Sequence, residues 1–323
     1  MKNSLCYILF SLISVCLAVD PNQICPPEDR IVPCYCEKDC DDCRVSLKCD
    51  SLQSQEILSR VVNQSNGHQY ELFELKGSNI TFIPASIFEA QKITSLKVWS
   101  TSMTSLFDRP PTTNLSDIYI LLFQVALPSI QWEMFQGIQN LRRLSVRHSQ
   151  IPQLVNSFSN NVPKGLEELV IYECETESLD DRAFAPFDHL LEIRIEVGKV
   201  RELKRSMFPS PAKLQVISFS YNELESLPED IFTDMPDLEK IYLRGNQLAE
   251  LSENIFKPLL PRLDAFKVAD NPLSCGCNMR WITSLERHHW TELYYVGSCK
   301  YPEELKNKAL KDLNEADFAQ CSQ

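Results

Sequence analysis

The sequence contains little glycine, with 8 glycines against 19 prolines in 323 residues. Glycine-rich loops bind phosphates and dinucleotides, and neither GxGxxG nor GxxxxGKS/T occurs, so a nucleotide-binding enzyme is disfavoured. Basic residues number 32 against 44 acidic ones, and the resulting formal charge of −12 disfavours a nucleic-acid-binding protein. With 44% hydrophobic residues, the chain can still bury a large core.

Long hydrophobic runs are also scarce. The apolar run from Leu5 to Leu17 follows the basic Lys2 and ends at the small Ala18, which predicts a signal peptide over residues 1–18. Its length of about 13 residues falls short of the roughly 20 that span a bilayer, although a membrane anchor is the alternative. The polar C-terminus has no hydrophobic tail for a lipid anchor. We therefore expect a secreted, extracellular protein without a membrane span after signal removal.

Catalytic and metal-binding motifs are missing as well. Neither GxSxG nor HExxH occurs, and no cysteine and histidine spacing suits zinc. His288 and His289 would point about 100° apart on a helix, which makes them poor joint ligands. The acidic segment from Glu37 to Asp42 could bind calcium loosely or be a solvated loop. We expect no enzyme activity, no cofactor and no metal, with an enzyme of unrecognised site as the remote alternative.

The 13 cysteines are the strongest compositional signal. Beyond the signal peptide and apart from Cys174, they gather near the two ends, as Cys25, Cys34, Cys36, Cys40, Cys43 and Cys49, and as Cys275, Cys277, Cys299 and Cys321. In a secreted chain such groups indicate structural disulfides, although the CxxC spacing of Cys40 and Cys43 also allows a zinc or redox pair. Three N-X-S/T sequons predict glycosylation at Asn63, Asn79 and Asn114.

Between the cysteine groups the chain repeats itself. Nine segments align on L-x-x-L-x-L-x-x-N-x-L, with starts at Tyr70, Ile93, Leu115, Leu141, Leu166, Leu190, Leu214, Leu238 and Leu263. A phenylalanine recurs 18 residues after most starts, at Phe88, Phe184, Phe208, Phe232 and Phe256. This is the signature of the leucine-rich repeat, and it predicts an α/β solenoid over residues 70–273. Each repeat adds one strand to a curved, parallel sheet whose outer face is concave, while its leucines face a core shared with its neighbours.

The ninth motif position is expected to satisfy backbone groups of adjacent turns. Asparagine occupies it in three repeats, as Asn222, Asn246 and Asn271. Other residues replace it elsewhere, namely Ser78, Thr101, Phe123, Ser149, Cys174 and Gly198. Cysteine is an alternative at this position in leucine-rich repeats, so the resemblance implies that Cys174 is a buried free thiol; an intermolecular disulfide is the other possibility.

Both ends of a solenoid expose core and need a cap. Residues 274–323 resemble the C-terminal cap of extracellular leucine-rich-repeat proteins, in which Asn-Pro-Leu closes the last repeat and a C-x-C pair precedes an aromatic residue, here Trp281. The resemblance implies the disulfides Cys275–Cys299 and Cys277–Cys321. Residues 19–69 resemble the matching N-terminal cap, which implies Cys25–Cys36 and Cys34–Cys49 and leaves Cys40–Cys43 as an extra bridge. Six cysteines allow fifteen connectivities, so spacing alone leaves this pairing open.

A narrower likeness concerns secreted arthropod leucine-rich-repeat proteins. Among them the non-catalytic subunit of Oplophorus-luciferin 2-monooxygenase is similar in length and in the layout of its caps. That resemblance implies an associating or carrier role in place of chemistry. A non-catalytic subunit of a secreted enzyme complex is therefore the alternative function.

The third, fifth and seventh motif positions alternate with the buried leucines and should line the concave face. They place large apolar groups there, with arginines between them, and interface hot spots are enriched in such residues. The predicted partner-binding patch comprises Trp99, Tyr119, Leu121, Tyr172, Arg143 and Arg147. A more charged zone, which could equally be solvated surface, holds Glu168, Glu192, Arg194, Glu196, Tyr242 and Arg244. A register slip of one residue in the irregular repeats at Ile93 and Leu115 would instead bury these groups.

We therefore expect a secreted, non-enzymatic protein-binding module. Its partner would be an extracellular protein such as a receptor, a matrix component or a secreted enzyme subunit, recognised through the concave face. Nucleic acid is not expected as a partner.

Overall fold

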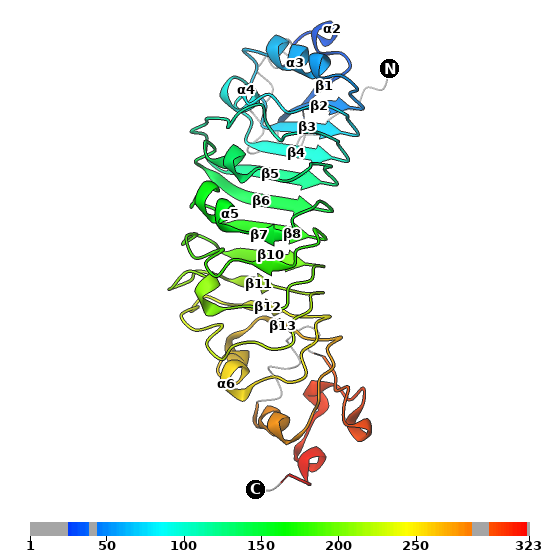
Figure 1. Cartoon of the computed structure of the whole chain (residues 1–323), viewed down its shortest axis with the longest axis vertical. Coiled ribbons are helices and arrows are strands. Elements are labelled where there is room, and N and C mark those ends of the chain that lie inside the picture. Colours follow the sequence, from blue (N-terminus) through cyan, green and yellow to red (C-terminus); the bar gives the residue numbers. More distant parts are fainter. Residues whose placement is uncertain (1–24, 39–43, 286–296, 322–323) are drawn as a thin grey trace, which may run out of the picture. The chain divides into compact units, whose positions relative to one another are not determined.

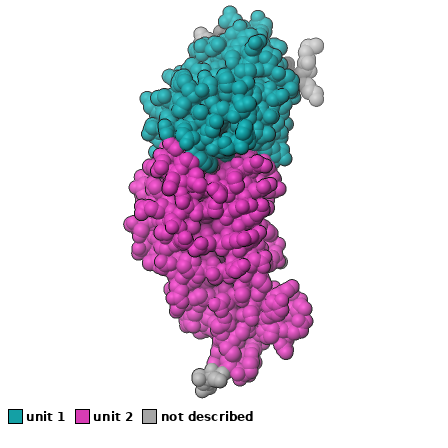
Figure 2. Space-filling view, in the orientation of Figure 1, with its two compact units in different colours: residues 1–143 teal, residues 144–323 magenta. Residues whose placement is uncertain are grey.

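The computed structural model describes residues 25–38, 44–285 and 297–321 (Figure 1). The predicted signal peptide, the proposed Cys40–Cys43 bridge and the pair His288 and His289 lie outside these residues. The chain divides into two compact units, unit 1 over residues 1–143 and unit 2 over residues 144–323 (Figure 2).

Unit 1 is built around parallel strands that succeed one another along the chain. After helix α2 (Glu28–Ile31), strand β1 (Tyr35–Lys38) pairs antiparallel with β2 (Val45–Asp50). From β2 onward the pairing is parallel and sequential, through β3 (Leu72–Lys76), β4 (Ser95–Trp99) and β5 (Ile118–Phe123). The connections carry α3 (Gln55–Gln64), α4 (Ser86–Glu89) and the 3-10 turn η1 (Trp132–Phe135), and β6 (Leu141–Arg147) runs across the boundary between the units.

Unit 2 continues the same one-strand-per-repeat plan. Its parallel strands pair in the order β8 (Glu168–Tyr172), β10 (Glu192–Glu196), β11 (Val216–Ser218), β12 (Lys240–Tyr242) and β13 (Ala265–Lys267). A second small sheet pairs β7 (Gln153–Leu154) with β9 (Ser178–Leu179). The remaining elements are α5 (Asn156–Asn161), η2 (Arg205–Met207), α6 (Glu253–Phe256), η3 (Leu260–Arg262), η4 (Cys277–Ser284), η5 (Glu303–Leu305), η6 (Leu310–Asp312) and η7 (Glu315–Phe318).

Motif leucines and the recurring phenylalanines make the core, as the spacing predicts. In β10, for example, Ile193 and Ile195 are buried, while the residues that alternate with them are partly exposed. The phenylalanines of the returning segments are also buried and contact their neighbours, with ring centroids 5.7 Å apart for Phe184 and Phe208. Phe232 and Phe256 pack in the same way, with centroids 6.3 Å apart, so neighbouring repeats share their apolar surface.

The ninth-position asparagines bind backbone groups of two repeats at once. Asn246 is 2% exposed; its side-chain amide donates to the carbonyls of Phe219 and Leu243, at 2.9 and 3.0 Å, and its oxygen accepts from the N–H of Leu224 at 3.0 Å. Asn222 and Asn271 make the corresponding bonds. These bonds supply the backbone partners that a buried turn otherwise lacks.

Cys174 occupies the ninth motif position of its repeat, where its thiol is a weaker hydrogen-bond donor than an asparagine amide. The thiol is free and buried, as predicted, and its sulfur lies 3.4 Å from the carbonyl oxygen of Val146 and 3.3 Å from that of Tyr172. Burial raises the pKa of the Cys174 thiol to about 11. The thiol therefore stays protonated at neutral pH, the form with little nucleophilic reactivity.

One repeat begins two residues later than the motif alignment suggests. Tyr119 pairs with Ser95 and Phe123 pairs with Trp99, so this repeat starts at Asp117, 24 residues after Ile93, and not at Leu115. The prediction that Phe123 holds the ninth position is therefore wrong, because Phe123 ends strand β5. A shift of two residues preserves the alternation of faces, so Tyr119 still lies on the outer side of its strand.

A second periodic feature follows directly after the seventh motif position. The residue there has a positive φ in successive repeats, in unit 1 at Ser51, Gly77, Ser100 and Gln124, and in unit 2 at His148, Glu173, Val197, Tyr221, Gly245 and Asp270. Glycine adopts this conformation without steric cost, but the chain has only 8 glycines and uses other residues at most of these turns. Val197, with φ of 56°, is the least suitable because its side chain is β-branched.

Replacing Val197 by asparagine should stabilise unit 2. Asparagine tolerates the left-handed region, which costs most other residues about 1–2 kcal/mol, so we expect the free energy of unfolding to rise by about 1 kcal/mol. Urea unfolding would measure the change. Val197→Ala is the control, because it removes the same side-chain contacts without the conformational benefit. Equal stability of the asparagine and alanine variants would show that the turn is not strained.

The disulfides confirm four pairs that the family resemblance implies. Both ends are cross-linked within the described residues, by Cys25–Cys36, Cys34–Cys49, Cys275–Cys299 and Cys277–Cys321. The C-terminal segment also docks through Trp281, whose indole N–H donates to the carbonyl of Leu251 at 3.2 Å. Each end of the repeat array is therefore covered by a segment that is covalently closed.

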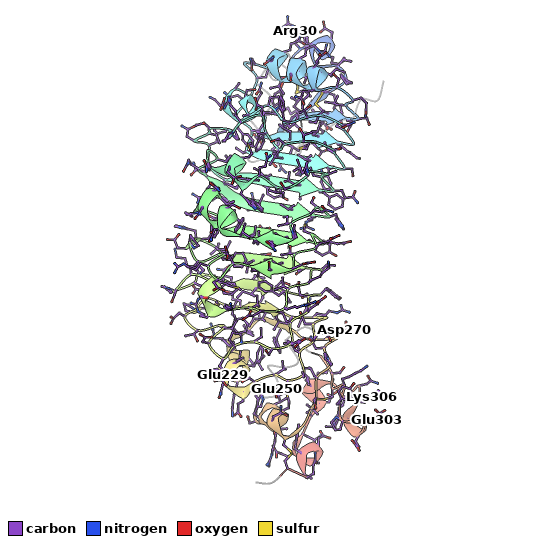
Figure 3. All side chains as sticks on the ribbon, in the orientation of Figure 1. Arg30, Glu229, Glu250, Asp270, Glu303 and Lys306 are labelled. Atoms are coloured by element: carbon purple, nitrogen blue, oxygen red, sulfur yellow. A yellow bond between two sulfur atoms is a disulfide. The ribbon has the colours of Figure 1, made fainter. Side chains whose placement is uncertain are left out.

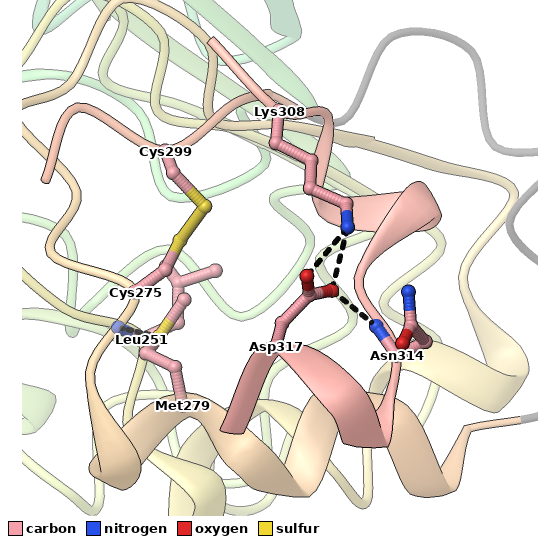
Figure 4. Close-up of a disulfide and its surroundings, with 7 residues drawn as sticks. All are labelled: Leu251, Cys275, Met279, Cys299, Lys308, Asn314 and Asp317. Carbon is pink, nitrogen blue, oxygen red and sulfur yellow. Dashed lines mark hydrogen bonds and ion pairs between the residues drawn. A yellow bond between two sulfur atoms is a disulfide. The ribbon is translucent and has the colours of Figure 1, made fainter. Parts of the chain in front are cut away.

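An ion pair stabilises the C-terminal cap beside one of these bridges (Figure 4). Lys308 contacts Asp317 at 2.6 Å, and the same carboxylate accepts the backbone N–H of Asn314 at 2.8 Å. Burial acts to raise the pKa of Asp317, but Lys308 and the Asn314 N–H outweigh it and hold that pKa below its ordinary value. The carboxylate is therefore ionised at neutral pH. In this form it accepts the N–H of Asn314, the residue that precedes η7.

Candidate partner-binding surface

The strands of both units turn alternate side chains away from the core. We call this outer side the open face of each unit; it corresponds to the face predicted to be concave. The third, fifth and seventh motif positions occupy it, and parallel register aligns them in rows across neighbouring strands.

The open face of unit 1 carries a cluster of aromatic rings. Trp99 and Phe123 are opposite one another on β4 and β5, with ring centroids 5.1 Å apart. At the other end of β5 the guanidinium of Arg143 lies 5.3 Å from the ring centroid of Tyr119. Leu121 lies between these two contacts on the same strand, and the large neighbours cover it, so that it is only 7% exposed.

The structure thus places three predicted residues, Trp99, Tyr119 and Arg143, on one open face and corrects the expected role of a fourth. Leu121 has too little exposed surface to be a contact residue in the unbound protein. Phe123 was missed because the motif alignment put it in a turn. A strict 24-residue period from Ile93 would have placed it on the strand. We define the unit 1 patch as Trp99, Tyr119, Phe123 and Arg143.

In unit 2 the first aromatic residue of the open face is Tyr172. The guanidinium of Arg147 lies 5.9 Å from its ring centroid, and the imidazole of His148 meets the ring edge-on at 5.6 Å. His148 also contacts the carboxylate of Glu173 at 3.2 Å. These contacts hold Tyr172 half-exposed in a fixed orientation, which lowers the entropy that binding would cost.

Further along the open face of unit 2, Arg194 is the centre of an ion-pair network. It bonds to Glu192, lies 3.7 Å from Glu196, and its guanidinium is 5.4 Å from the ring centroid of Tyr242. Burial acts to lower the pKa of Arg194, but the two carboxylates raise it above its ordinary value. Ser218, on strand β11 between β10 and β12, donates its hydroxyl to Glu196. Much of the predicted charged zone is therefore internally paired.

The three sequon asparagines lie outside the open faces. Asn63 is on helix α3, Asn79 follows β3, and Asn114 precedes β5; all three are exposed. None of the three asparagines lies on strands β4, β5 or β6, so glycans at these positions would not be attached to the strands that carry the unit 1 patch. Their occupancy remains a prediction.

No metal site emerges from the part of the chain that the structure describes. No group of three or more histidine, cysteine, aspartate or glutamate side chains in it could hold a metal ion. Glu37, from the acidic segment considered for calcium, instead contacts Lys48 at 2.6 Å. Two adjoining hollows of about 420 and 460 Å³ share Arg205, whose guanidinium bonds the carbonyls of Thr233 and Phe208. Two of the three guanidinium nitrogens of Arg205 thus bind the backbone, while its Nη2 is buried without a hydrogen-bond partner.

None of the helices described in the structure combines the length and the apolar character that crossing a bilayer requires.

Comparison with known proteins agrees with the repeat pattern. Residues 189–248 match the family model described as leucine rich repeat. Trophoblast glycoprotein of Macaca fascicularis is 23% identical over 316 residues, which cover 91% of this chain and 68% of that protein. The peroxidasin homolog pxn-2 of Caenorhabditis elegans is 26% identical over 110 residues, and the chain spans 8% of its length.

Solved structures show the same fold. A chain from the octameric complex of latrophilin 3, Unc5D and FLRT2 (LRR) has a TM-score of 0.58 at 16% identity, covering 87% of this chain and 97% of that one. A chain from the TLR13-ssRNA13 complex has a TM-score of 0.59 at 21% identity, covering 69% of this chain and 32% of that one. The repeated strands, the bonded cysteines near both ends and these similarities together show a leucine-rich-repeat fold with disulfide-bonded caps at its ends.

Proposed function

We propose that this chain is a secreted, glycosylated and non-enzymatic module that binds an extracellular protein through its open face. The observation that carries the proposal is the unit 1 patch, in which Trp99 and Phe123 form one pair and Tyr119 and Arg143 another. The structural disulfides and the likeness to trophoblast glycoprotein support an extracellular location. The repeat provides the scaffold, and the exposed side chains provide the specificity.

The unit 1 patch has the composition of an interface centre. A solvated sheet face usually alternates apolar inner residues with polar outer ones. Here Trp99, Tyr119 and Phe123 occupy outer positions and keep part of their surface exposed. Tryptophan, tyrosine and arginine are the residue types that contribute most to binding energy in known interfaces. Their mutual stacking also holds them in place before a partner arrives, which reduces the entropic cost of association.

Truncating the patch tests the proposal. The double variant Trp99→Ala/Tyr119→Ala should weaken partner binding by at least about tenfold, since each hot-spot residue contributes about 1–2 kcal/mol or more. The tagged mature chain would be used to capture proteins from its native extracellular fluid, with quantification by mass spectrometry. Tyr301→Ala is the matched control, because Tyr301 is 54% exposed but lies in the C-terminal cap. Full capture by a folded double variant would contradict the proposal.

The identity of the captured protein would also distinguish the two candidate roles. A receptor, a matrix component or a foreign surface protein would support a free-standing binder. A single secreted enzyme, recovered in a ratio near one to one and co-migrating in gel filtration, would instead assign the chain as a non-catalytic subunit. That second role follows from the likeness in length and cap layout to such a subunit.

A further inference from the structure

Lys97 stands in the middle of the open face of unit 1, next to the unit 1 patch. The strands of this unit lie side by side (Figure 3), and their register puts Lys97 of β4 opposite Leu121 of β5. Trp99 follows Lys97 by two residues on the same side of β4, and Tyr119 and Phe123 lie two residues before and after Leu121. Lys97 therefore occupies the row between the Trp99–Phe123 pair and Tyr119.

The ammonium group of Lys97 is not bonded to a carboxylate of the chain. It makes neither a hydrogen bond nor an ion pair with any residue that the structure describes, although the side chain is half-buried. Glu74 is opposite Lys97 on β3, but it is also opposite Lys48 on its other side. The hydrogen bond with Glu37 raises the pKa of Lys48, and the carboxylate of Glu74 adds to that shift. Of these two lysines, the one beside the aromatic rings thus lacks a bonded carboxylate.

An ammonium group without an ion pair restricts which partner can bind at the middle of a contact surface. A partner that covers the rings on both sides of Lys97 also removes water from the Lys97 side chain. A charged group that loses water without gaining an opposite charge destabilises the complex. Lys97 and the unit 1 patch together contain two cations and no carboxylate, so the complementary group has to come from the partner.

We propose that Lys97 selects a partner protein with an extended segment that presents a carboxylate side chain between two apolar ones. Successive outer positions on a strand are roughly 6.6 Å apart, and alternate side chains of an extended segment repeat that distance. Such a segment would place one apolar side chain against Trp99 and Phe123, and its carboxylate two residues further on at Lys97. The second apolar side chain, after another two residues, would reach Tyr119. The inference rests on the proposed function, since it assigns chemistry to the protein that the open face recognises.

Three labelled peptides with blocked ends test this order of side chains. The reference peptide is Ser-Leu-Ser-Glu-Ser-Leu-Ser; the second has glutamine in place of glutamate, and the third, Ser-Glu-Ser-Leu-Ser-Leu-Ser, has the same composition in another order. Fluorescence anisotropy measures the Kd of each peptide with the full mature chain. We expect the reference peptide to bind about tenfold more tightly than the glutamine peptide and about fivefold more tightly than the reordered one. Equal affinities, or no binding of the reference peptide, would overturn the proposal.

A double-mutant cycle locates the carboxylate at Lys97. With Lys97→Met the reference and glutamine peptides should bind equally, because methionine keeps most of the side-chain length but removes the charge. Lys92→Met is the matched control, since it removes the same charge from an exposed residue outside the strands and should retain the preference for glutamate. An unchanged preference with Lys97→Met, or an equal loss of preference in the control, would contradict the assignment to Lys97.

Glu74 provides a second check, in which the sign of the effect decides. Glu74→Gln removes a carboxylate that repels an acidic ligand from the neighbouring strand, so we expect the reference peptide to bind about twofold more tightly. If Glu74 instead turned to pair with Lys97 when a ligand docks, the same variant would weaken binding and the proposal would fail. Binding of sialyllactose in place of the peptides would indicate a glycan carboxylate and would also count against a protein ligand.

Partner capture separates this inference from the proposed function. If Trp99→Ala/Tyr119→Ala loses the captured partner while Lys97→Met captures it in full, the selection by Lys97 fails and the proposed function stands. If the aromatic double variant captures its partner in full, the role proposed for the unit 1 patch fails. In that case the peptide cycle still decides whether Lys97 binds a carboxylate.

Discussion

Replacing Asn246 by alanine should lower the free energy of unfolding by about 3–4 kcal/mol. The variant removes two donated bonds to the carbonyls of Phe219 and Leu243 and leaves the N–H of Leu224 without its acceptor. The unpaired N–H costs about 1–3 kcal/mol, and each of the two lost bonds about 0.5–1.5 kcal/mol, because the carbonyls of Phe219 and Leu243 keep their bonds from Asn222 and Asn271. Because these three groups belong to neighbouring repeats, the loss should separate the repeats as well as weaken one of them.

Thermal and urea unfolding measure this effect. A loss of this size in a domain of this length should lower Tm by roughly 6–12 °C. Asn254→Ala is the matched control, because Asn254 is exposed and makes one side-chain bond, 3.0 Å long, to Glu229. If Asn246→Ala were no more destabilising than Asn254→Ala, the asparagine ladder would not be a source of repeat-to-repeat stability.

Removing the disulfide between Cys277 and Cys321 should destabilise the C-terminal cap by about 4 kcal/mol. The bridge closes a loop with a sequence separation of 44, and cross-linking a longer loop removes more entropy from the unfolded chain. Cys277 is exposed and Cys321 half-exposed, so Cys277→Ser/Cys321→Ser removes the cross-link with little loss of buried surface. Replacing Cys275 and Cys299, which are buried, would combine the loss of the cross-link with a change in buried surface.

Hydrogen exchange of the η4 amides reports the stability of this cap, and their protection should fall strongly in the variant. The N-terminal bridge Cys25–Cys36 provides the comparison, since both of its cysteines are half-exposed and its sequence separation is 11. Cys25→Ser/Cys36→Ser should cost about 1 kcal/mol less, from the logarithmic dependence on loop length. Unchanged exchange in η4 would mean that packing alone, through Trp281, holds the cap.

Both stability predictions concern features whose positions were readable from the amino-acid sequence. The asparagines recur at the motif spacing, and the cysteine pattern resembles a known pair of caps closely enough to imply the four bridges found among the described residues. The positions of the recurring phenylalanines also follow the motif spacing, and these residues are buried in the structure. These positions are predictable because a side chain that is buried in every repeat must recur with the period of the backbone turn.

The candidate site was less predictable, and β5 shows why. A repeat that starts at Leu115 and one that starts at Asp117 have the same alternation of buried and outer residues. The motif alone therefore cannot show which of the two residues starts the repeat. The pairing of β5 with β4 places Phe123 opposite Trp99 and so fixes the start of the repeat at Asp117. The same pairing surrounds Leu121 with larger side chains and buries it, although its position in the strand is an outer one.

Alternation along the chain thus determined the fold, the repeat period and which side of each strand faces outward. Contacts between repeats decided which outer residues remain available to a partner. Tyr242 illustrates this division: its outer position follows from the motif, whereas its place between Arg194 and Lys267 depends on the register of three neighbouring pairings. The inward-facing positions follow from the periodicity of one strand, but the exposure of an outward-facing residue depends on several strands together, and only tertiary packing sets their alignment.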